Sequence, residues 1–336
     1  MSARKRQDGK RRFGLFAKCV HFVLIVSSLI VGTFLTGGYF LGEDMPFVGW
    51  LFEFPMLFFL GAAILMVFVF AGTGLRCWVL LPLAEVALCV LLLQPQWNSF
   101  EPVPKGTESV TIMSYNVNQF LFGREGIVDT VCKVRPDILI LQEYSGNAET
   151  LKDIQDKLFP DGNSILTHQN AVFSKYHIKE VEWVEVSGYR SIQKLTLDVD
   201  DEEVTLCNVH FPVVVRLNSL RMDDLDTIVE AVDKQRTGRY KLLELVDNRT
   251  GPMIVSGDFN AAPHTILVRT LQEKLQDSFL VGGAGIGNSF DSRLPLVRID
   301  YVFLSDEFTV YSHEVLNDKA SDHRPIVVRV SLDQSE

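Results

Sequence analysis

Two long apolar runs near the N-terminus restrict what this chain can fold into more than any other feature. Residues 20–41 and 54–75 contain no Asp, Glu, Lys or Arg. Each run is long enough to cross a bilayer core of about 30 Å as a helix. Residues 77–93 form a third apolar run, which is shorter and is interrupted by a proline and a glutamate. We therefore predict a transmembrane region over residues 19–94 with about three helices.

The charges around these runs predict the orientation of the chain. Residues 1–18 carry seven Lys and Arg against the single acid Asp8, so this segment should stay in the cytoplasm. The loop after the first run carries Glu43 and Asp44 and no base, whereas the next loop carries Arg76. Three spans would place the C-terminal part outside the cytoplasmic membrane. A cleaved signal peptide is the alternative for the first run, but its apolar stretch is longer than the usual signal core.

The rest of the chain alternates between strand-like and helix-like patterns. Residues 95–108 contain three prolines and a glycine and indicate a linker, which leaves residues 109–333 as one domain. The predicted strands lie at residues 110–115, 138–141, 171–173, 192–197, 204–209, 253–256, 299–304 and 326–330. The predicted helices lie at residues 126–134, 148–158, 219–246 and 265–275. This mixture predicts an α/β domain with its chemistry at strand ends.

The net charge limits the partners of this domain. The whole chain has a formal charge of −10, and from residue 105 onward 24 Lys and Arg stand against 36 Asp and Glu. Non-specific DNA binding depends on the neutralisation of phosphates by basic residues, so an acidic domain is a poor general DNA binder. A local basic patch could still bind DNA, although the domain as a whole is acidic. Five basic residues could form a phosphate-binding edge or a solvated helix face: Arg216, Arg221, Lys234, Arg236 and Arg239.

Polar residues end the hydrophobic runs of the domain in six places. Each run closes on one or two residues drawn from Asn, Glu, His and Asp, the side chains that bind a hard cation and activate water. The six blocks are Ser114-Tyr115-Asn116-Val117, Leu141-Gln142-Glu143, Asn208-Val209-His210, Gly257-Asp258-Phe259-Asn260, Arg298-Ile299-Asp300-Tyr301 and Ser321-Asp322-His323-Arg324-Pro325.

This order of blocks resembles the endonuclease/exonuclease/phosphatase superfamily, the DNase I-like proteins, over roughly residues 108–332. The resemblance implies two packed β-sheets flanked by helices, a four-layer sandwich that follows the helical transmembrane region. It also implies a hydrolase of phosphoester substrates with a Mg²⁺ cofactor, which Mn²⁺ could replace. Each block alone would be a weak signal, but six in the same order make the resemblance specific.

The resemblance assigns the metal to three residues. Glu143 follows a buried strand and becomes the principal ligand, Asn116 a second ligand or a positioner, and Asp322 a residue near the metal. Mg²⁺ keeps several waters and takes few protein ligands, so a carboxylate at a strand end suits it. In isolation, Glu143 would be an ordinary solvated side chain and Asn116 an ordinary turn residue.

The same resemblance assigns the catalytic residues. Asp258 and Asn260 lie two apart in an extended segment, so both can face one phosphate. In the family, the equivalent of Asp300 orients the last histidine, here His323, which accepts a proton from the attacking water. His210 occupies a position where the DNase I-like and sphingomyelinase-like branches carry a histidine that contacts the scissile phosphate. Whether Asp258 or His210 protonates the leaving oxygen stays open, because neighbouring titrating groups share their protons.

Two departures narrow the expected function. The chain lacks the Trp-containing loop of the abasic-site enzymes between Phe290 and Arg298, and it has no Trp-Cys-Asp-Arg signature of the inositol polyphosphate phosphatases. From the resemblance and the apolar runs we expect a membrane-anchored, Mg²⁺-dependent phosphoesterase, and the acidic domain and the bilayer attachment fit a lipid phosphodiester or a small phosphoester as its substrate. The alternatives are an extracytoplasmic nuclease and a non-catalytic binding module that keeps the fold. No oligomeric state follows from the sequence.

Overall fold

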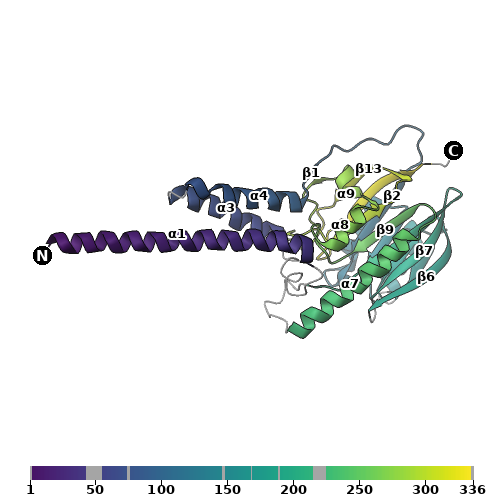
Figure 1. Ribbon diagram of the computed structural model, residues 1–336. Coiled ribbons are helices and arrows are strands. Elements are labelled where there is room, and N and C mark those ends of the chain that lie inside the picture. The colour runs from purple at the N-terminus through teal and green to yellow at the C-terminus, as the bar shows by residue number, and fades with distance from the viewer. Residues whose placement is uncertain are drawn as a thin grey trace.

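The computed structural model of the protein has two parts, a set of N-terminal helices and an α/β sandwich (Figure 1). The residues that it describes are 2–42, 55–73, 76–145, 148–167, 169–187, 190–214 and 225–333. Glu43 and Asp44 lie outside these residues, as do Arg216 and Arg221. The expectations that rest on these four residues are therefore not addressed by the structure.

Three apolar helices project from one side of the sandwich (Figure 1). They are α1 (Ser2–Leu41), α3 (Met56–Gly72) and α4 (Leu80–Leu93), with a 3-10 turn, η2 (Arg76–Trp78), before the last. The three pack against one another around Leu35, Met56 and Cys89. Among the described helices, the segment Lys18–Leu41 of α1 is the one that is long and apolar enough to cross a membrane. The second and third helices, of 17 and 14 residues, are shorter than the runs that predicted them.

The sandwich consists, over the described residues, of two six-stranded sheets and a short two-stranded ribbon. The first sheet has the order β13-β14-β2-β3-β5-β4. Its strands are β2 (Val110–Asn116), β3 (Ile138–Gln142), β4 (Asn163–Leu166), β5 (Ala171–Ser174), β13 (Phe308–Val315) and β14 (Ile326–Leu332). The second sheet has the order β10-β12-β9-β8-β7-β6. Its strands are β6 (His177–Ser187), β7 (Arg190–Val199), β8 (Glu202–His210), β9 (Met253–Asp258), β10 (Gln276–Asp277) and β12 (Asp300–Leu304).

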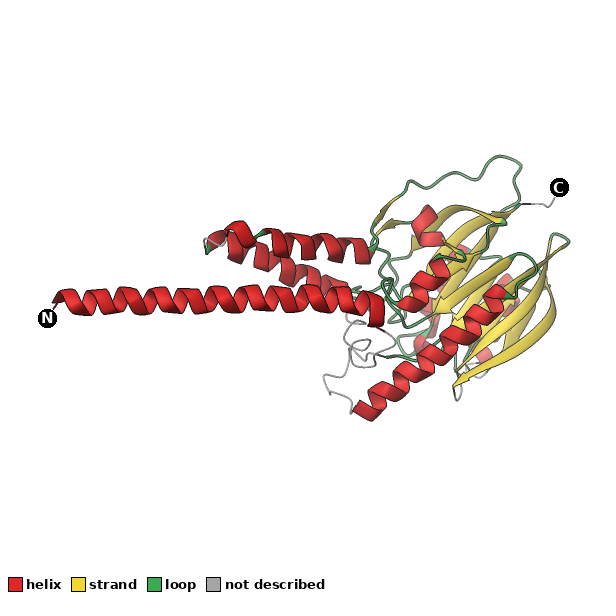
Figure 2. Cartoon of the chain, viewed as in Figure 1, coloured by secondary structure: helices red, strands yellow, loops and turns green. Residues whose placement is uncertain are grey.

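Helices cover the outer faces of both sheets, which gives four layers (Figure 2). The helices of the sandwich are α5 (Arg124–Val134), α6 (Ala148–Leu158), α7 (Leu225–Asp247), α8 (Ile266–Gln272) and α9 (Ser278–Gly282), with a turn, η3 (Asn118–Phe120). Alternate strand residues such as Ile140 and Leu206 fill the space between the sheets. One outer core joins α5 and α6 to the first sheet, and another joins α7 and α8 to the second. This arrangement confirms the predicted fold class.

The strands that the sequence did not predict lie mostly at sheet edges. The eight predicted strands and four predicted helices of the domain are present, most of them with shifted ends, and residues 219–224 of the predicted third helix lie outside the described residues. In the two six-stranded sheets, β4, β6, β10 and β13 are additional, and each is the last strand on one side of its sheet. β6 is exposed along most of its length and carries several charged residues. β6 buries little apolar surface, so its hydrophobic pattern is weak.

The segment between α4 and β2 is held against the sandwich. Its short strand β1 (Gln96–Trp97) pairs with β11 (Ala284–Gly285). Asn98 Nδ2 donates to the carbonyl of Leu280 at 2.9 Å, and the backbone N–H of Glu101 donates to a carbonyl of β13 at 3.1 Å. The residues predicted as a linker thus connect the helices firmly to the domain.

Candidate active site

The polar residues of the sequence blocks meet at one edge of the sandwich. Asn116 ends β2 and Glu143 directly follows the parallel strand β3. His210 ends β8 and Asp258 ends the parallel strand β9. Asp300 begins β12, which is antiparallel to β9, and pairs directly with Asp258. Strand direction therefore brings all five residues to the same edge.

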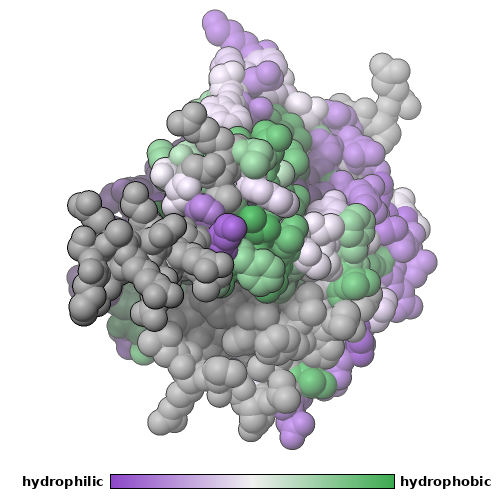
Figure 3. All heavy atoms as spheres, turned by 60° about the vertical axis from the view of Figure 1, so that its left-hand side comes forward, coloured by the Kyte–Doolittle hydropathy of each residue, from purple (hydrophilic) through white to green (hydrophobic). Residues whose placement is uncertain are grey.

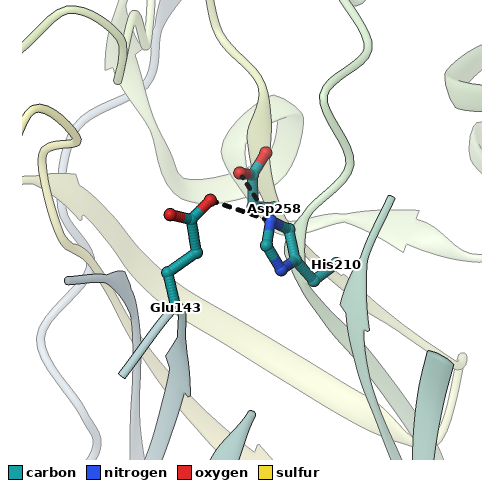
Figure 4. Close-up of side chains that lie close together, drawn as sticks. All are labelled: Glu143, His210 and Asp258. Atoms are coloured by element: carbon teal, nitrogen blue, oxygen red, sulfur yellow. Dashed lines mark ion pairs between the residues drawn. The ribbon is translucent and has the colours of Figure 1, made fainter. Parts of the chain in front are cut away.

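Glu143, His210 and Asp258 turn their side chains toward one another (Figure 4). The Nε2 atom of His210 lies 3.1 Å from Glu143 Oε1 and 3.8 Å from Asp258 Oδ2. Asn116 Nδ2 donates to Asp258 Oδ2 at 2.9 Å and to Glu143 Oε1 at 3.4 Å. A single amide thus joins carboxylates that come from two different sheets.

The end of β9 and the loop after it depend on backbone conformations that few residues adopt. Gly257 has a φ of +139°, and a Cβ atom there would lie 2.0 Å from the carbonyl oxygen of Val209. Asn260, with a φ of 48°, donates its backbone N–H to Asp258 Oδ1 at 2.9 Å and its Nδ2 to the carbonyl of Phe211 at 2.9 Å. A non-glycine residue with positive φ costs free energy, and such residues concentrate at functional sites.

His323 is held by Asp300. The Nδ1 atom of His323 lies 2.9 Å from Asp300 Oδ2, and both side chains are buried. The ring of Phe290 packs beside the imidazole at 4.9 Å between centroids. The other ring nitrogen, Nε2, lies 3.8 Å from Asp258 Oδ2. Asp300 therefore fixes the ring so that Nε2 faces the centre of the site.

Burial and charge shift the pKa values of this group. Burial raises the pKa of Asp258 to about 7, with the charge of His323 acting against this rise and that of Asp300 adding to it. Burial alone would lower the pKa of His323, but the charges of Asp300 and Asp258 and the bond to Asp300 raise it to about 10. Asp258 and His323 therefore titrate together.

Two overlapping groups of side chains have the composition of a metal site. Glu143, His210 and Asp258 form one, and Asp258, Asp300 and His323 the other, with ligand atoms within 4.8 Å of one another in each. The first group fits a hard divalent cation better, because the Glu143 side chain is 24% exposed and leaves room for the waters that Mg²⁺ retains. The second group is enclosed by protein, and its histidine is already engaged by Asp300.

The other two residues assigned to the metal lie near this group but differ in their contacts. Asn116 Oδ1 accepts the backbone N–H of Asn118 at 3.0 Å, so its NH₂ faces the carboxylates. This arrangement suits the positioning role better than that of a ligand. Asp322 belongs to neither group, and its Oδ1 accepts a bond from Ser321 Oγ at 3.3 Å. Ser321 also donates to the carbonyl of Asn116 at 2.7 Å, which ties the two blocks together.

Two buried amides behind the site were given no role from the sequence. Gln142 Nε2 donates to Asn208 Oδ1 at 2.9 Å, and Asn208 Nδ2 lies 3.2 Å from both the carbonyl of Leu141 and Gln193 Oε1. These bonds join the two sheets directly beneath Glu143 and His210. The sequence signal for them was a polar residue inside an otherwise apolar strand, which must find a partner when it is buried.

Two of the basic residues considered for a phosphate-binding edge lie on a solvated face of α7. Lys234 pairs with Glu230, and Arg236 pairs with Asp233, each within the same helix. Arg239 is buried, with its guanidinium 5.0 Å from the ring centroid of Tyr240. The contacts of Lys234 and Arg236 favour the helix-face interpretation over a phosphate-binding edge, whereas the buried Arg239 fits neither interpretation.

Comparisons with known proteins agree with this geometry. The sequence profile of the Endonuclease/Exonuclease/phosphatase family matches residues 113–323, more than half of the chain. A search of curated proteins gave no match. Similar solved structures include an endonuclease/exonuclease/phosphatase from Beutenbergia cavernae, with 19% identity, 67% of this chain and 72% of that chain covered, and a TM-score of 0.52. The catalytic domain of human Nocturnin has 17% identity, 67% and 94% coverage and a TM-score of 0.53. A mannosyl-6-phosphatase from Bacteroides thetaiotaomicron has 21% identity, 66% and 100% coverage and a TM-score of 0.51.

Proposed function

We propose that this chain, which belongs to the endonuclease/exonuclease/phosphatase family of phosphoester hydrolases, is a membrane-anchored, Mg²⁺-dependent enzyme. In this proposal it hydrolyses its substrate at the membrane surface. The observation that carries the proposal is the position of the site. The end of α4 contacts Arg298, which lies in a catalytic block, and the end of α1 contacts α8, which follows the block of Asp258 and Asn260.

Exposed apolar side chains support the membrane anchor. Phe22, Phe68 and Leu91 expose 69%, 70% and 72% of their surface, and they belong to α1, α3 and α4 respectively. In the view that brings the helices forward, hydrophobic residues gather at the centre and hydrophilic residues lie mainly along the right-hand margin (Figure 3). Such a surface is unfavourable in water and favourable in lipid. The basic residues in the first part of α1, up to Lys18, favour a cytoplasmic N-terminus, and three spans then place the domain outside.

Contacts at the helix ends support a site that faces the bilayer. Arg269 in α8 stacks on Tyr39 near the end of α1, with its guanidinium 3.7 Å from the ring centroid. The same Arg269 donates to the carbonyl of His264, in the loop that follows Asn260, at 3.2 Å. Helix ends and catalytic loops therefore lie on the same side of the sandwich (Figure 1). A phosphoester at the membrane surface would reach the site from this side.

In the proposed mechanism, Glu143 holds the cation and Asn116 keeps that carboxylate in place. Bound Mg²⁺ would supply Lewis-acid polarisation of a non-bridging phosphate oxygen. Asn116 donates to Glu143 and to Asp258 at once, so the carboxylates keep a fixed separation. Asp322 contributes negative charge close to His323.

His323 is the proposed base. Its Nδ1 is committed to Asp300, so Nε2 takes the proton of the attacking water in the form of the site in which the ring is neutral and Asp258 carries the proton. Asp300 stabilises the imidazolium that forms, which is the reason for burying a carboxylate beside it. Proton transfer of this kind requires the ring to stay in one orientation, and the 2.9 Å contact provides that orientation.

Asp258, Asn260 and His210 are the proposed phosphate-binding and leaving-group residues. The Nε2 of His210 faces the same space as Asp258 Oδ2, 3.8 Å away. A carboxyl group whose pKa is raised to about 7 can hold a proton near neutral pH and give it to a leaving oxygen. Asn260 Nδ2 lies 3.1 Å from Asp258 Oδ2 and keeps this carboxyl in position.

Charge and membrane attachment favour a lipid phosphodiester or a small phosphoester as substrate. The acidic domain has few of the basic residues that nucleic-acid binding requires. Structural relatives include a mannosyl-6-phosphatase, so the fold also accepts small phosphomonoesters.

The decisive experiment uses the full-length protein in lipid nanodiscs. A truncated protein starting at Lys105 would lose the bonds of Gln94, Asn98 and Glu101 to the domain. We would assay sphingomyelin, glycerophospholipids, small mono- and diesters and plasmid DNA, each with Mg²⁺ and with EDTA. We expect metal-dependent hydrolysis of a lipid or small phosphoester. Preferential cleavage of DNA would identify a nuclease, and no hydrolysis of any ester would reject the proposal.

A further inference from the structure

A polar network joins the end of α4 to the catalytic edge of the sandwich. Gln94 follows the last residue of α4, and its side-chain amide exchanges two hydrogen bonds of 3.0 Å with the amide of Gln272, the last residue of α8. Gln272 Nε2 also donates to Asp277 Oδ2 at 2.9 Å. Gln94 Oε1 accepts a further bond from the guanidinium of Arg298 at 3.1 Å. The end of an apolar helix is thus hydrogen-bonded to a residue inside a catalytic sequence block.

Arg298 is held in one conformation by its surroundings. It is 1% exposed and donates twice to Asp277, at 3.0 and 2.9 Å. Its guanidinium lies between the rings of Phe279 and Tyr301, 4.6 and 4.8 Å from their centroids. A buried charge must be paired and hydrogen-bonded to be tolerated, and here Gln94 provides the acceptor that Asp277 does not.

The backbone of Arg298 leads directly into the catalytic pair. Asp300 follows two residues later and contacts His323 at 2.9 Å. The hydroxyl of Tyr301 lies 2.9 Å from the carbonyl of Arg298 and 2.9 Å from that of Ala261, which follows Asn260. A shift of Arg298 would therefore move both the strand that carries Asp300 and the loop that carries Asn260.

We propose that Gln94 is a positioning residue for hydrolysis, which acts through Arg298 to keep Asp300 aligned with His323. The proposal rests on the catalytic roles proposed above for Asp300 and His323. In this proposal, α4 supports the geometry of the active site and also anchors the protein in the membrane. Gln94 itself does not contact the reacting atoms.

Two substitutions of Gln94 separate this role from a general effect on folding. Gln94→Met removes the acceptor while keeping the length of the side chain, and Gln94→Glu keeps an oxygen that can accept from Arg298. Because small displacements of catalytic groups have large effects on rate, we expect Gln94→Met to lower kcat by about 10-fold. KM should not change, and Gln94→Glu should retain most of the wild-type kcat. Gln94→Asn, whose shorter side chain cannot reach Arg298, should resemble Gln94→Met.

The matched control is Asn98→Ala, measured like the others on the full chain in nanodiscs. It removes another bond between the post-α4 segment and the domain, to Leu280, without touching Arg298. We expect its kcat to equal that of the wild type. In an enzyme that already carries Asp300→Asn, adding Gln94→Met should lower kcat little further, because both changes disturb the same alignment of Asp300 with His323.

The outcomes distinguish this inference from the proposed function. An active wild type in which Gln94→Met and Gln94→Asn fold normally and keep full kcat would overturn the inference and leave the function intact. An equal loss in Asn98→Ala would overturn it as well, since the effect would then be general loosening. A wild type without phosphoesterase activity would reject the function and the inference together.

Discussion

Asn116 donates a 2.9 Å hydrogen bond from its Nδ2 to Asp258 Oδ2, and the two residues stand at the ends of strands in different sheets. The bond connects residues 142 positions apart and is buried. It holds the Asp258 carboxyl at a fixed distance from Glu143, to which the same amide donates. The geometry of the site therefore depends on how the two sheets pack.

Loss of this bond should impair hydrolysis. We expect Asn116→Ala to lower kcat by about 10- to 100-fold, as is typical when a group that orients a metal-binding carboxylate is removed. Asn163→Ala is the matched control. Asn163 lies in β4, an edge strand of the first sheet, and its side-chain amide donates to the carbonyl of Tyr176. Steady-state assays of both variants check the prediction. Equal losses would show that only general stability is involved.

His323 and Asp300 should act as one unit. His323→Ala removes the proposed base and should lower the rate by about 10²- to 10⁴-fold. Asp300→Asn should also slow hydrolysis, because the imidazole loses the carboxylate that orients it at 2.9 Å. The double variant should be little slower than His323→Ala alone, since penalties within a catalytic unit are not additive. If the rate losses of the two single variants instead multiply in the double variant, measured as single-turnover rates, the two residues act independently and the pairing is contradicted.

Metal binding should depend on Glu143. Glu143→Gln should abolish most activity and weaken Mg²⁺ or Mn²⁺ binding measured by calorimetry, without changing the melting temperature greatly. Glu149→Gln is a suitable control, because that carboxylate is exposed and pairs with Arg124 on the surface. Turnover that continues unchanged in EDTA would disprove the metal role.

Stability should fall in acid because of His313, which lies outside the catalytic site. Burial lowers its pKa from 6.5 to about 3, with Arg298 adding to the shift and Asp277 opposing it. The unfolded chain therefore binds a proton near pH 6.5 that the native protein does not accept, so stability decreases as the pH falls from about 6.5 to 3. His313→Asn should reduce this slope in thermal unfolding of the full chain in detergent. An unchanged slope would mean that other groups cause the acid sensitivity.

The orientation of the chain can be measured directly. A C-terminal alkaline phosphatase fusion should be active, and a C-terminal GFP fusion exported by the general secretory route should be dark. The seven basic residues before the first apolar run should hold the N-terminus in the cytoplasm, and the three predicted spans would then place the C-terminus outside. The reverse pattern would indicate an even number of spans and a cytoplasmic domain.

Much of the fold and of the site was predictable from local sequence. Strand periodicity is a short-range property, so the buried strands ending at Asn116, His210 and Asp258 could be placed from their own residues. The ordered polar blocks then indicated the family, and with it the four-layer arrangement. Edge strands such as β6 were missed because a strand with little burial has no strong apolar pattern.

Other features depend on contacts that form only in the folded protein. Whether Asn116 serves as a ligand or a positioner depends on its bond across the sheets to Asp258. The bond between Gln94 and Arg298 joins residues 204 apart, so no pattern within either segment could indicate it. Side chains far apart in sequence meet only when helices and sheets bury their apolar surfaces together. The order of residues along the chain thus specifies which side chains can take part in catalysis, and the packing of the two sheets specifies which of them meet.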